Sequence, residues 1–315
     1  MRIVMTGATG FIGSAVLERL TGPGAPGPQD SPIHLTVLGR TPSARISASG
    51  ADWRTADLAD PGSLSGTCRD ADVLLHLGGT LSPDPEVCHA VNAAGTAALM
   101  SEARNAGVRR IIHLSTAAVC GPGPHRGLEV QEIIPKPVSP ASISRLAAEG
   151  PALDAGATVL RPGLVLGRGD RWVVPALAQL LERVPALWDG GRAKHSAVDV
   201  RSLAQLIVSL ALQDDTVPAG VFHASHPQPV TTGQLLNALA DLGVLKRVTE
   251  SWEWRRCLEV FRSTPGSLSE RQFHLLAQDH WYVSRAIWET AALHPGAGPH
   301  LQLADARSWY RNLTL

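Results

Sequence analysis

Three glycines near the start of the chain have the spacing that lets a backbone turn hold a phosphate. They lie in the segment Thr6-Gly7-Ala8-Thr9-Gly10-Phe11-Ile12-Gly13. Gly7 permits a tight turn, Gly10 lets the backbone approach a pyrophosphate, and Gly13 lets a helix pack closely on a strand. The amide groups of residues 9–12 would then face the phosphates at a helix N-terminus. The segment therefore predicts a dinucleotide site, and a purely structural glycine turn is the alternative.

A second segment carries the side chain that would select the dinucleotide. The run Val37-Leu38-Gly39-Arg40 ends without an acid, although an NAD site usually has a carboxylate here for the ribose 2′-hydroxyl. Arg40 offers a planar cation suited to a 2′-phosphate, so we predict NADP(H). An exposed surface arginine is the alternative interpretation.

Two further turns could contact the same cofactor. Asp57, followed by Leu58, could accept a hydrogen bond from an adenine amino group, or it could be a solvated turn residue. Leu77-Gly78-Gly79 ends another apolar run, where the missing side chains would let the backbone lie against the cofactor. The alternative for this segment is an ordinary turn at the end of a strand.

Strands and helices that alternate along the first half would position these turns. The apolar pattern predicts strands at Arg2–Thr6, Ile33–Leu38, Val73–Leu77, Arg110–Leu114 and Ala157–Leu160, and helices at Phe11–Leu20 and Ala90–Ala106. A loop rich in Gly and Pro is predicted at Thr21–Ser31. This alternation favours an α/β fold, a Rossmann-type doubly wound parallel sheet with helices on both faces.

The second half reads as a smaller, mostly helical substrate lobe. We predict a Rossmann domain at 1–167 and the lobe at 168–315, with segments that return to the core. Helices are expected at Trp172–Leu187, Ser202–Leu212 and Thr231–Leu242, a strand at Gly220–His223, and mostly helix from Trp252 to Leu293. Seven of the eight tryptophans lie here and are core residues by default, although some could line a flat apolar pocket.

Composition excludes several classes of function. The 28 basic and 28 acidic residues cancel, and no basic run marks a surface for nucleic acid. The longest apolar stretch, near Leu203–Leu212, is too short to span a membrane. The four cysteines form no CxxC pair, so we expect buried thiols in a cytoplasmic protein and no metal site. A monomer or homodimer is expected.

Read in order, these segments resemble the extended short-chain dehydrogenase/reductase family, which includes nucleotide-sugar epimerases, dehydratases and ketoreductases. The resemblance covers nearly the whole chain. Besides the segments above, it is carried by His76–Gly79, Asn92–Thr96, Leu114–Gly121, Leu160–Gly163 with Val165–Gly167, and His195–Val200. It implies that Leu114, Arg145, Pro162 and Val165 also contact the cofactor.

The resemblance places the family's reacting groups at three positions. Thr116 stands at the family's Ser/Thr position, where its hydroxyl would hydrogen-bond a carbonyl oxygen. Ala141 stands where the family has the proton-transferring Tyr, and Arg145 stands where it has the Lys. Alanine has no ionisable group, and arginine stays charged at any working pH, although it can still bind a ribose or a phosphate. The usual proton relay is therefore absent. Tyr282 and Tyr310 lie far downstream, so no small shift in alignment restores it.

Hydride transfer needs positioning more than it needs the missing tyrosine. The resemblance extends to aromatic polyketide ketoreductases of the angucyclinone type, which lack that tyrosine and are held to use a proton from the substrate. This implies an NADPH-dependent ketoreductase that acts on a polycyclic ketone. A cofactor-binding redox sensor without catalysis is the second hypothesis. A nucleotide-sugar epimerase or dehydratase is the third, for which Arg255, Arg256 and Arg262 would give only thin phosphate-binding support.

Overall fold

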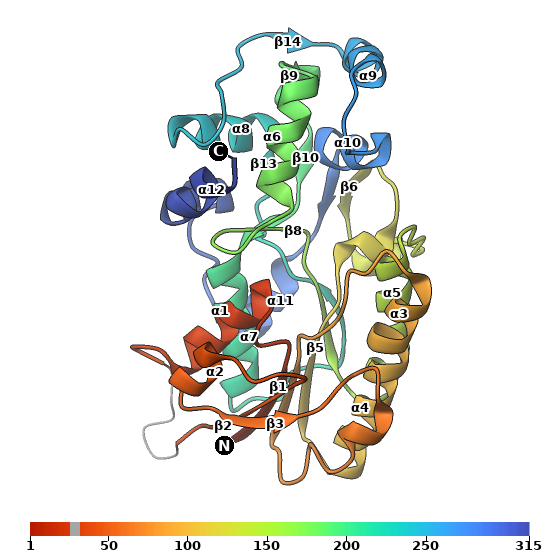
Figure 1. Cartoon of the computed structure of the whole chain (residues 1–315), viewed down its shortest axis with the longest axis vertical. Coiled ribbons are helices and arrows are strands. Elements are labelled where there is room, and N and C mark those ends of the chain that lie inside the picture. The colour runs from red at the N-terminus through yellow and green to blue at the C-terminus, as the bar shows by residue number, and fades with distance from the viewer. Residues whose placement is uncertain (26–31, 315) are drawn as a thin grey trace.

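Seven short strands, most of them apolar, form one parallel sheet (Figure 1). The structure is a computed structural model that describes residues 1–25 and 32–314. Neighbouring strands are parallel throughout, in the order β12-β7-β5-β4-β1-β2-β3. Their bounds are β1 (Arg2–Thr6), β2 (His34–Gly39), β3 (Asp52–Thr55), β4 (Val73–His76), β5 (Arg110–Leu114), β7 (Thr158–Arg161) and β12 (Gly220–His223). The predicted Rossmann-type sheet is confirmed, while residues 26–31 of the predicted loop lie outside the described residues.

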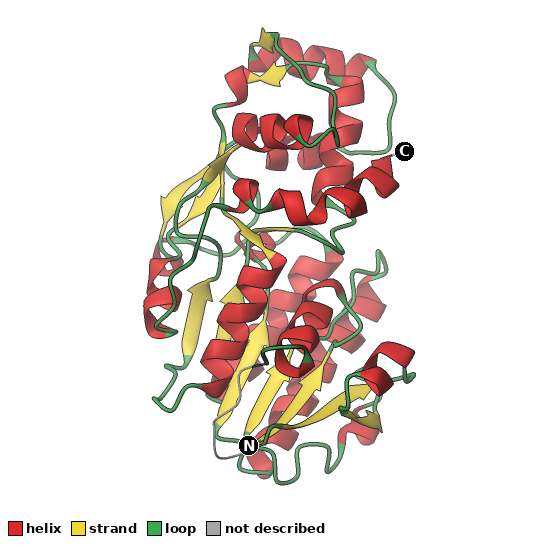
Figure 2. Ribbon diagram, turned by 90° about the vertical axis from the view of Figure 1, so that its left-hand side faces the viewer, coloured by secondary structure: helices red, strands yellow, loops and turns green. Residues whose placement is uncertain are grey.

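Helices cover both faces of this sheet (Figures 1 and 2). One face carries α1 (Phe11–Thr21), α7 (Val200–Leu212) and α11 (Arg285–Thr290), and the apolar core beneath them includes Val16, Leu206 and Trp288. The other face carries α3 (Pro85–Cys88), a π-helical turn (His89–Ala94), α4 (Gly95–Asn105) and α5 (Pro140–Asp154). The short α2 (Ala44–Ala48) precedes β3. The sheet is therefore buried on both sides, as a parallel sheet requires.

A mostly helical lobe lies beyond the carboxyl ends of the central strands (Figure 1). It contains α6 (Val173–Arg183), α8 (Thr232–Asp241), α9 (Trp254–Ser263), α10 (Glu270–Ala277), α12 (Arg307–Thr314) and the paired strands β9 (Leu187–Trp188) and β14 (Ser251–Trp252). A separate apolar core around Trp188, Phe273 and Tyr310 holds these helices together. The predicted helical lobe is confirmed, but the sequence pattern does not indicate its short strands, among them β9 at the end of an expected helix and β15 (His280–Tyr282).

Several elements pass between the sheet and the lobe. The mixed sheet β13-β10-β15-β6 joins β13 (Val230–Thr231), β10 (Lys194–His195) and β15 to β6 (His125–Leu128) from the first half of the chain. In the opposite direction, β12 and α7 return to the large sheet, and β8 (Leu164–Leu166) pairs with β11 (Ala197–Asp199). A domain boundary at residue 167 therefore stays a prediction.

A buried ion pair fixes helix α5 against the sheet. The guanidinium of Arg161 at the end of β7 donates to both carboxylate oxygens of Glu149 at 2.9 and 2.5 Å. Both side chains are about 95% buried. The Ser115 hydroxyl donates to the same carboxylate at 2.5 Å. This pair ties α5 to the strand ends on which residues 115 and 116 lie.

Within the described part of the chain, no helix is long and apolar enough to cross a membrane. Cys68, Cys88, Cys120 and Cys257 are buried free thiols.

Replacing Glu149 by Gln is expected to destabilise the fold, because it leaves the Arg161 charge buried without its partner. Breaking such a pair costs about 3–5 kcal/mol. Urea unfolding of the purified protein measures the difference. The matched control is Glu259→Gln, which removes an exposed pair with Arg255 on α9 and should cost less than about 1 kcal/mol. Equal losses in the two variants would contradict this account.

Candidate cofactor and catalytic site

In the turn between β1 and α1, the backbone packs directly against the backbone of neighbouring segments. Gly7 has φ +76°, and a Cβ added there would lie 2.5 Å from the amide nitrogen of Gly78. A Cβ on Gly13 would lie 2.0 Å from the carbonyl oxygen of Gly7. Neither position has room for a side chain, so the first turn of α1 closes directly onto the ends of β1 and β4. These are the constraints predicted from the glycine spacing.

The N-terminus of α1 presents free amide groups to any anion above it. Gly10 caps the helix without a side-chain hydrogen bond, and no acidic residue lies in the first turn. A Cβ on Gly10 would meet only the carbonyl oxygen of Gly7, at 3.3 Å. Thr9 and Gly10 are exposed, whereas Phe11 and Ile12 are half-buried. A cradle of this shape fits a dinucleotide pyrophosphate, stabilised by the helix dipole.

Arg40 follows the last residue of β2 and is exposed. Within residues 1–25 and 32–314 its guanidinium has no hydrogen-bond or ion-pair partner, unlike Arg45 nearby, which pairs with Glu18 at 3.0 Å. Asp57 is half-buried and accepts a hydrogen bond from the Ala59 amide at 3.0 Å, so it acts here as a turn residue. The roles of Arg40, Asp57 and Leu58 toward a cofactor stay predictions.

The end of β4 lies directly beside the glycine turn. The Gly78 amide donates to the Thr6 hydroxyl at 3.0 Å, and Leu77 is buried. Gly79 is exposed, and a Cβ on it would lie 3.0 Å from the Arg145 guanidinium and 2.8 Å from the Asn92 side-chain oxygen. The two glycines therefore leave a backbone surface that runs from the turn to Arg145.

Arg145, on α5, points toward this surface. Its guanidinium donates to the Leu114 carbonyl at 3.0 Å and is half-buried, and burial lowers the pKa of the group. An arginine still keeps its charge under working conditions. Asn92 donates to Ser144 on the same helix at 2.9 Å and also binds the backbone of Thr80. This framework holds Arg145 where a ribose hydroxyl or a phosphate could meet its remaining donors.

Thr116 lies just beyond the end of β5, and its neighbours are fixed by the backbone. The Ser115 amide donates to the Leu160 carbonyl, and the Ala117 amide donates to the Pro162 carbonyl, both at 2.8 Å. The half-buried Thr116 hydroxyl accepts from the Ala118 amide at 3.2 Å and caps the 3-10 helix η3 (Ala117–Cys120). Its own O–H remains free to donate to a carbonyl oxygen.

Ala141 lies in the first turn of α5, where it offers only a methyl group. Ser139 and Ser142 form the capping box of this helix, so their hydroxyls are used locally. Ser144 donates to the Ala141 carbonyl at 3.1 Å. Val165 lies in β8, opposite Val198 of β11, and its cofactor contact stays a prediction. No replacement for the missing acid is present in the first turn of α5.

Two histidines that the sequence does not single out as a pair lie beneath the turn. His76 bonds Thr6 at 2.7 Å and Thr96 at 2.8 Å, and its ring stacks on His113 at 5.0 Å. Burial lowers the pKa of His76 to about 3 and that of His113 well below its ordinary value. Both are therefore neutral at working pH and support the strand ends.

The register of β4 and β5 places the two histidines side by side. This register could not be predicted from the sequence.

The lobe carries two tryptophans near a surface hollow of about 530 Å³. Its lining residues are Asp189, Arg192, Ser251, Trp252, Glu253, Trp254 and Arg255. None of the residues predicted to hold the cofactor lines this hollow, and Trp188 is fully buried in the lobe core. A tryptophan-lined substrate pocket stays a prediction.

The glycine cradle on a parallel sheet defines a Rossmann-type dinucleotide-binding protein. Residues 3–223 match the family model described as the NAD dependent epimerase/dehydratase family, so the chain belongs to this nicotinamide-dependent family. The predicted family resemblance is confirmed.

Curated relatives align over most of the chain. A 2-alkyl-3-oxoalkanoate reductase of Stenotrophomonas maltophilia (strain K279a) is 26% identical over 88% of this chain and 84% of its own length. A 4-hydroxy-2-methyl-3-oxo-4-farnesyl-3,4-dihydroquinoline-1-oxide ketoreductase of Stigmatella aurantiaca is 28% identical over 78% and 74%. The structure of UDP-glucuronic acid 4-epimerase from Bacillus cereus, in complex with UDP-glucuronic acid and NAD, has a TM-score of 0.73 at 17% identity, covering 99% of this chain and 100% of that one. This last likeness supports the fold alone.

Replacing Gly13 by Ala is expected to weaken binding of nicotinamide dinucleotides by at least about tenfold, because a Cβ there would displace the cradle carbonyl. Calorimetric titration with NADPH measures the effect. Gly150→Ala is the matched control, since its Cβ would meet nothing within 4 Å on α5. The account is wrong if both variants bind the cofactor like the wild type.

Proposed function

We propose that this protein is an NADPH-dependent ketoreductase that reduces a carbonyl of an aromatic, polyketide-type polycyclic substrate of the angucyclinone kind. The observation that carries the proposal is the alanine at position 141, on a chain that keeps the glycine cradle and Thr116. Epimerases and dehydratases depend on the tyrosine that this position lacks, whereas a reduction needs chiefly a bound hydride donor and an oriented carbonyl. The two relatives described above are named as reductases of ketones.

Within this proposal the residues divide into three tasks. The glycine cradle would hold the pyrophosphate, and Arg40 would hold the 2′-phosphate that distinguishes NADPH. Arg145 would hold the nicotinamide ribose in place of lysine. The hydroxyl of Thr116 would donate to the substrate carbonyl and hold its carbon toward the cofactor. Bound NADPH would supply the hydride.

The proton is the second requirement of the reduction. A phenol beside the carbonyl would supply it from within the substrate, because a phenol has a pKa of about 10. Loss of a positioned acid otherwise costs about a hundred- to ten-thousandfold in rate. A polycyclic aryl ketone with a neighbouring phenol therefore suits this site. The proposal includes a cytoplasmic monomer or homodimer.

The nucleotide-sugar epimerase alternative is weaker on structural grounds. Arg262 pairs with Glu270, Arg255 pairs with Glu259, and Arg256 lies over the Trp252 ring, so these arginines do not form a diphosphate cluster for a nucleotide sugar. A redox sensor would bind NADP⁺ and NADPH with clearly different affinities and turn over no ketone. Loss of the Tyr and Lys favours this second candidate, and the assay below separates the two.

Purified protein is expected to oxidise NADPH only when a suitable ketone is present, without any need for Ala141→Tyr. Suitable probes are peri-hydroxytetralone, its methyl ether and a hydroxylated angucyclinone quinone, with loss of NADPH absorbance as the readout. The hydroxylated ketone should react at least about tenfold faster than the methyl ether, because it carries its own acid. Failure of the whole panel would overturn the ketoreductase proposal.

Arg40→Ala is expected to weaken NADPH binding by about ten- to a hundredfold and leave NADH binding unchanged, because only NADPH carries the 2′-phosphate. Fluorescence titration measures both dissociation constants. Arg45→Ala, which removes an exposed arginine already paired with Glu18, is the control and should leave both constants unchanged. A parallel loss for NADPH and NADH would contradict the role given to Arg40.

A further inference from the structure

A tyrosine far away in the sequence lies beside the segment that contains Thr116. Tyr282, on β15, packs in one small apolar core with Ala117, Val119 and Cys120 of η3, the helix that Thr116 caps. Its hydroxyl is hydrogen-bonded to Nδ1 of His125 on β6 at 2.8 Å. We propose that His125, held by Tyr282, is the protein's proton donor for the reduction. This inference rests on the ketoreductase function proposed above.

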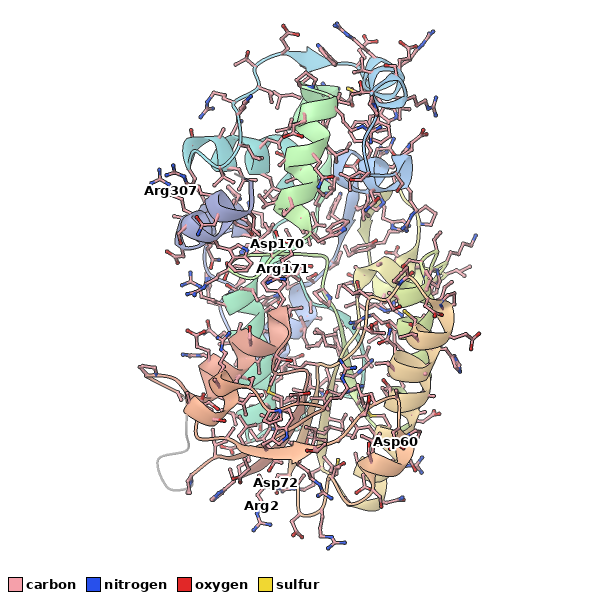
Figure 3. All side chains as sticks on the ribbon, in the orientation of Figure 1. Arg2, Asp60, Asp72, Asp170, Arg171 and Arg307 are labelled. Carbon is pink, nitrogen blue, oxygen red and sulfur yellow. The ribbon has the colours of Figure 1, made fainter. Side chains whose placement is uncertain are left out.

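The other candidate donors near this segment are already occupied. Glu149 accepts hydrogen bonds from Arg161 and Ser115, and Arg145 keeps its proton. The second tyrosine, Tyr310, belongs to the lobe core and donates to Asp170 at 3.2 Å. Figure 3 shows Asp170 where the lobe meets the sheet.

Strand geometry directs His125 toward Tyr282. Neighbouring side chains on a strand point to opposite faces. Pro124 and Arg126 line an outer hollow of about 350 Å³, so His125 faces the other way, where it meets Tyr282. Its side chain is half-buried, whereas that of Tyr282 is only 5% exposed. Within the described residues Nε2 of His125 has no hydrogen-bond partner, so this nitrogen is the one left for a substrate, and Tyr282 is the positioning residue.

A buried histidine supports the tyrosine from its other side. The ring of His223, at the end of β12, stacks on the Tyr282 ring at 4.4 Å with an angle of 14° between the planes. His223 is 98% buried, and neither of its ring nitrogens has a partner in the described chain. Leaving such groups unpaired costs stability. The stacked His223 ring therefore holds the Tyr282 ring in one orientation.

Burial of His125 favours a proton that leaves easily. Its ring contacts those of Tyr282 and His280 on β15, and it is coupled electrostatically to His223 at the end of β12. Burial lowers the pKa of His125 and raises that of Tyr282. The imidazolium is therefore a stronger acid than an exposed histidine, while the phenol stays protonated.

The step balances as an ordinary carbonyl reduction. Hydride and its electron pair go to the carbonyl carbon, and the π pair of the carbonyl moves to oxygen. The Nε2–H bond of His125 breaks as the O–H bond of the alcohol forms. Neutral imidazole remains, with Nδ1–H donating to the Tyr282 oxygen, and solvent returns the proton to Nε2. A ketone with its own phenol needs this donor less than one without.

The test compares peri-hydroxytetralone with its methyl ether in wild type, His125→Gln, Tyr282→Phe and the control His34→Gln. We expect His125→Gln to lower kcat for the methyl ether about a hundred- to ten-thousandfold and for the hydroxyketone less than tenfold. Wild-type kcat for the methyl ether should fall as pH rises through the lowered pKa of His125, and this limb should vanish in the variant. Tyr282→Phe should reduce kcat for the methyl ether less than His125→Gln does. His34→Gln should react like wild type, because His34 is exposed at the start of β2.

Thermal melting and NADPH titration verify that each variant is folded and binds cofactor. The His125 proposal is overturned if His125→Gln keeps the methyl-ether rate, or if it slows both ketones equally with an unchanged pH profile, because a structural role would do that. If wild type reduces neither ketone while binding NADPH, the proposed function itself fails, and this inference fails with it.

Discussion

The structure depends on the contact between bare backbone at Gly7, Gly13 and Gly78. With no Cβ at these positions, the first turn of α1 closes on the ends of β1 and β4 at distances that no side chain would permit. The uncapped amides of α1 then lie at the carboxyl edge of the sheet. Thr116 follows a strand that ends at the same edge. The position of each later group, including Arg145 on α5, follows from how the sheet and its helices meet this edge.

The site combines the fold of its family with an alanine at the position where the resemblance places the proton-transferring tyrosine. The Glu149–Arg161 pair and the Ser115 hydrogen bond hold α5 against the strand ends. Ala141, in the first turn of this helix, has no acidic group. Binding and orientation of a hydride donor need not change when that acid is lost. Chemistry that moves protons on and off a sugar would suffer most, whereas reduction of a ketone with its own acidic neighbour would suffer least.

The large sheet and the glycine turn could be predicted from local sequence. The glycine spacing, the apolar runs and the alternation of strand and helix predict the sheet because they express short-range rules of backbone geometry. The position of Tyr282 could not be predicted, because 157 residues separate it from His125 and only the pairing of β15 with β6 brings them together. Sequence distance had suggested that this tyrosine was irrelevant to the site. The stacked pair His76 and His113 was likewise hidden, since it depends on strand register.

The most direct measurement is an equilibrium titration of the wild-type protein with NADPH, NADP⁺, NADH and NAD⁺, followed by tryptophan and nicotinamide fluorescence. The account predicts saturable binding with one site per chain, and tighter binding of the two phosphorylated coenzymes than of their counterparts. Absence of association with all four would contradict the claim that the glycine turn seats a dinucleotide, and with it the proposed chemistry at Thr116.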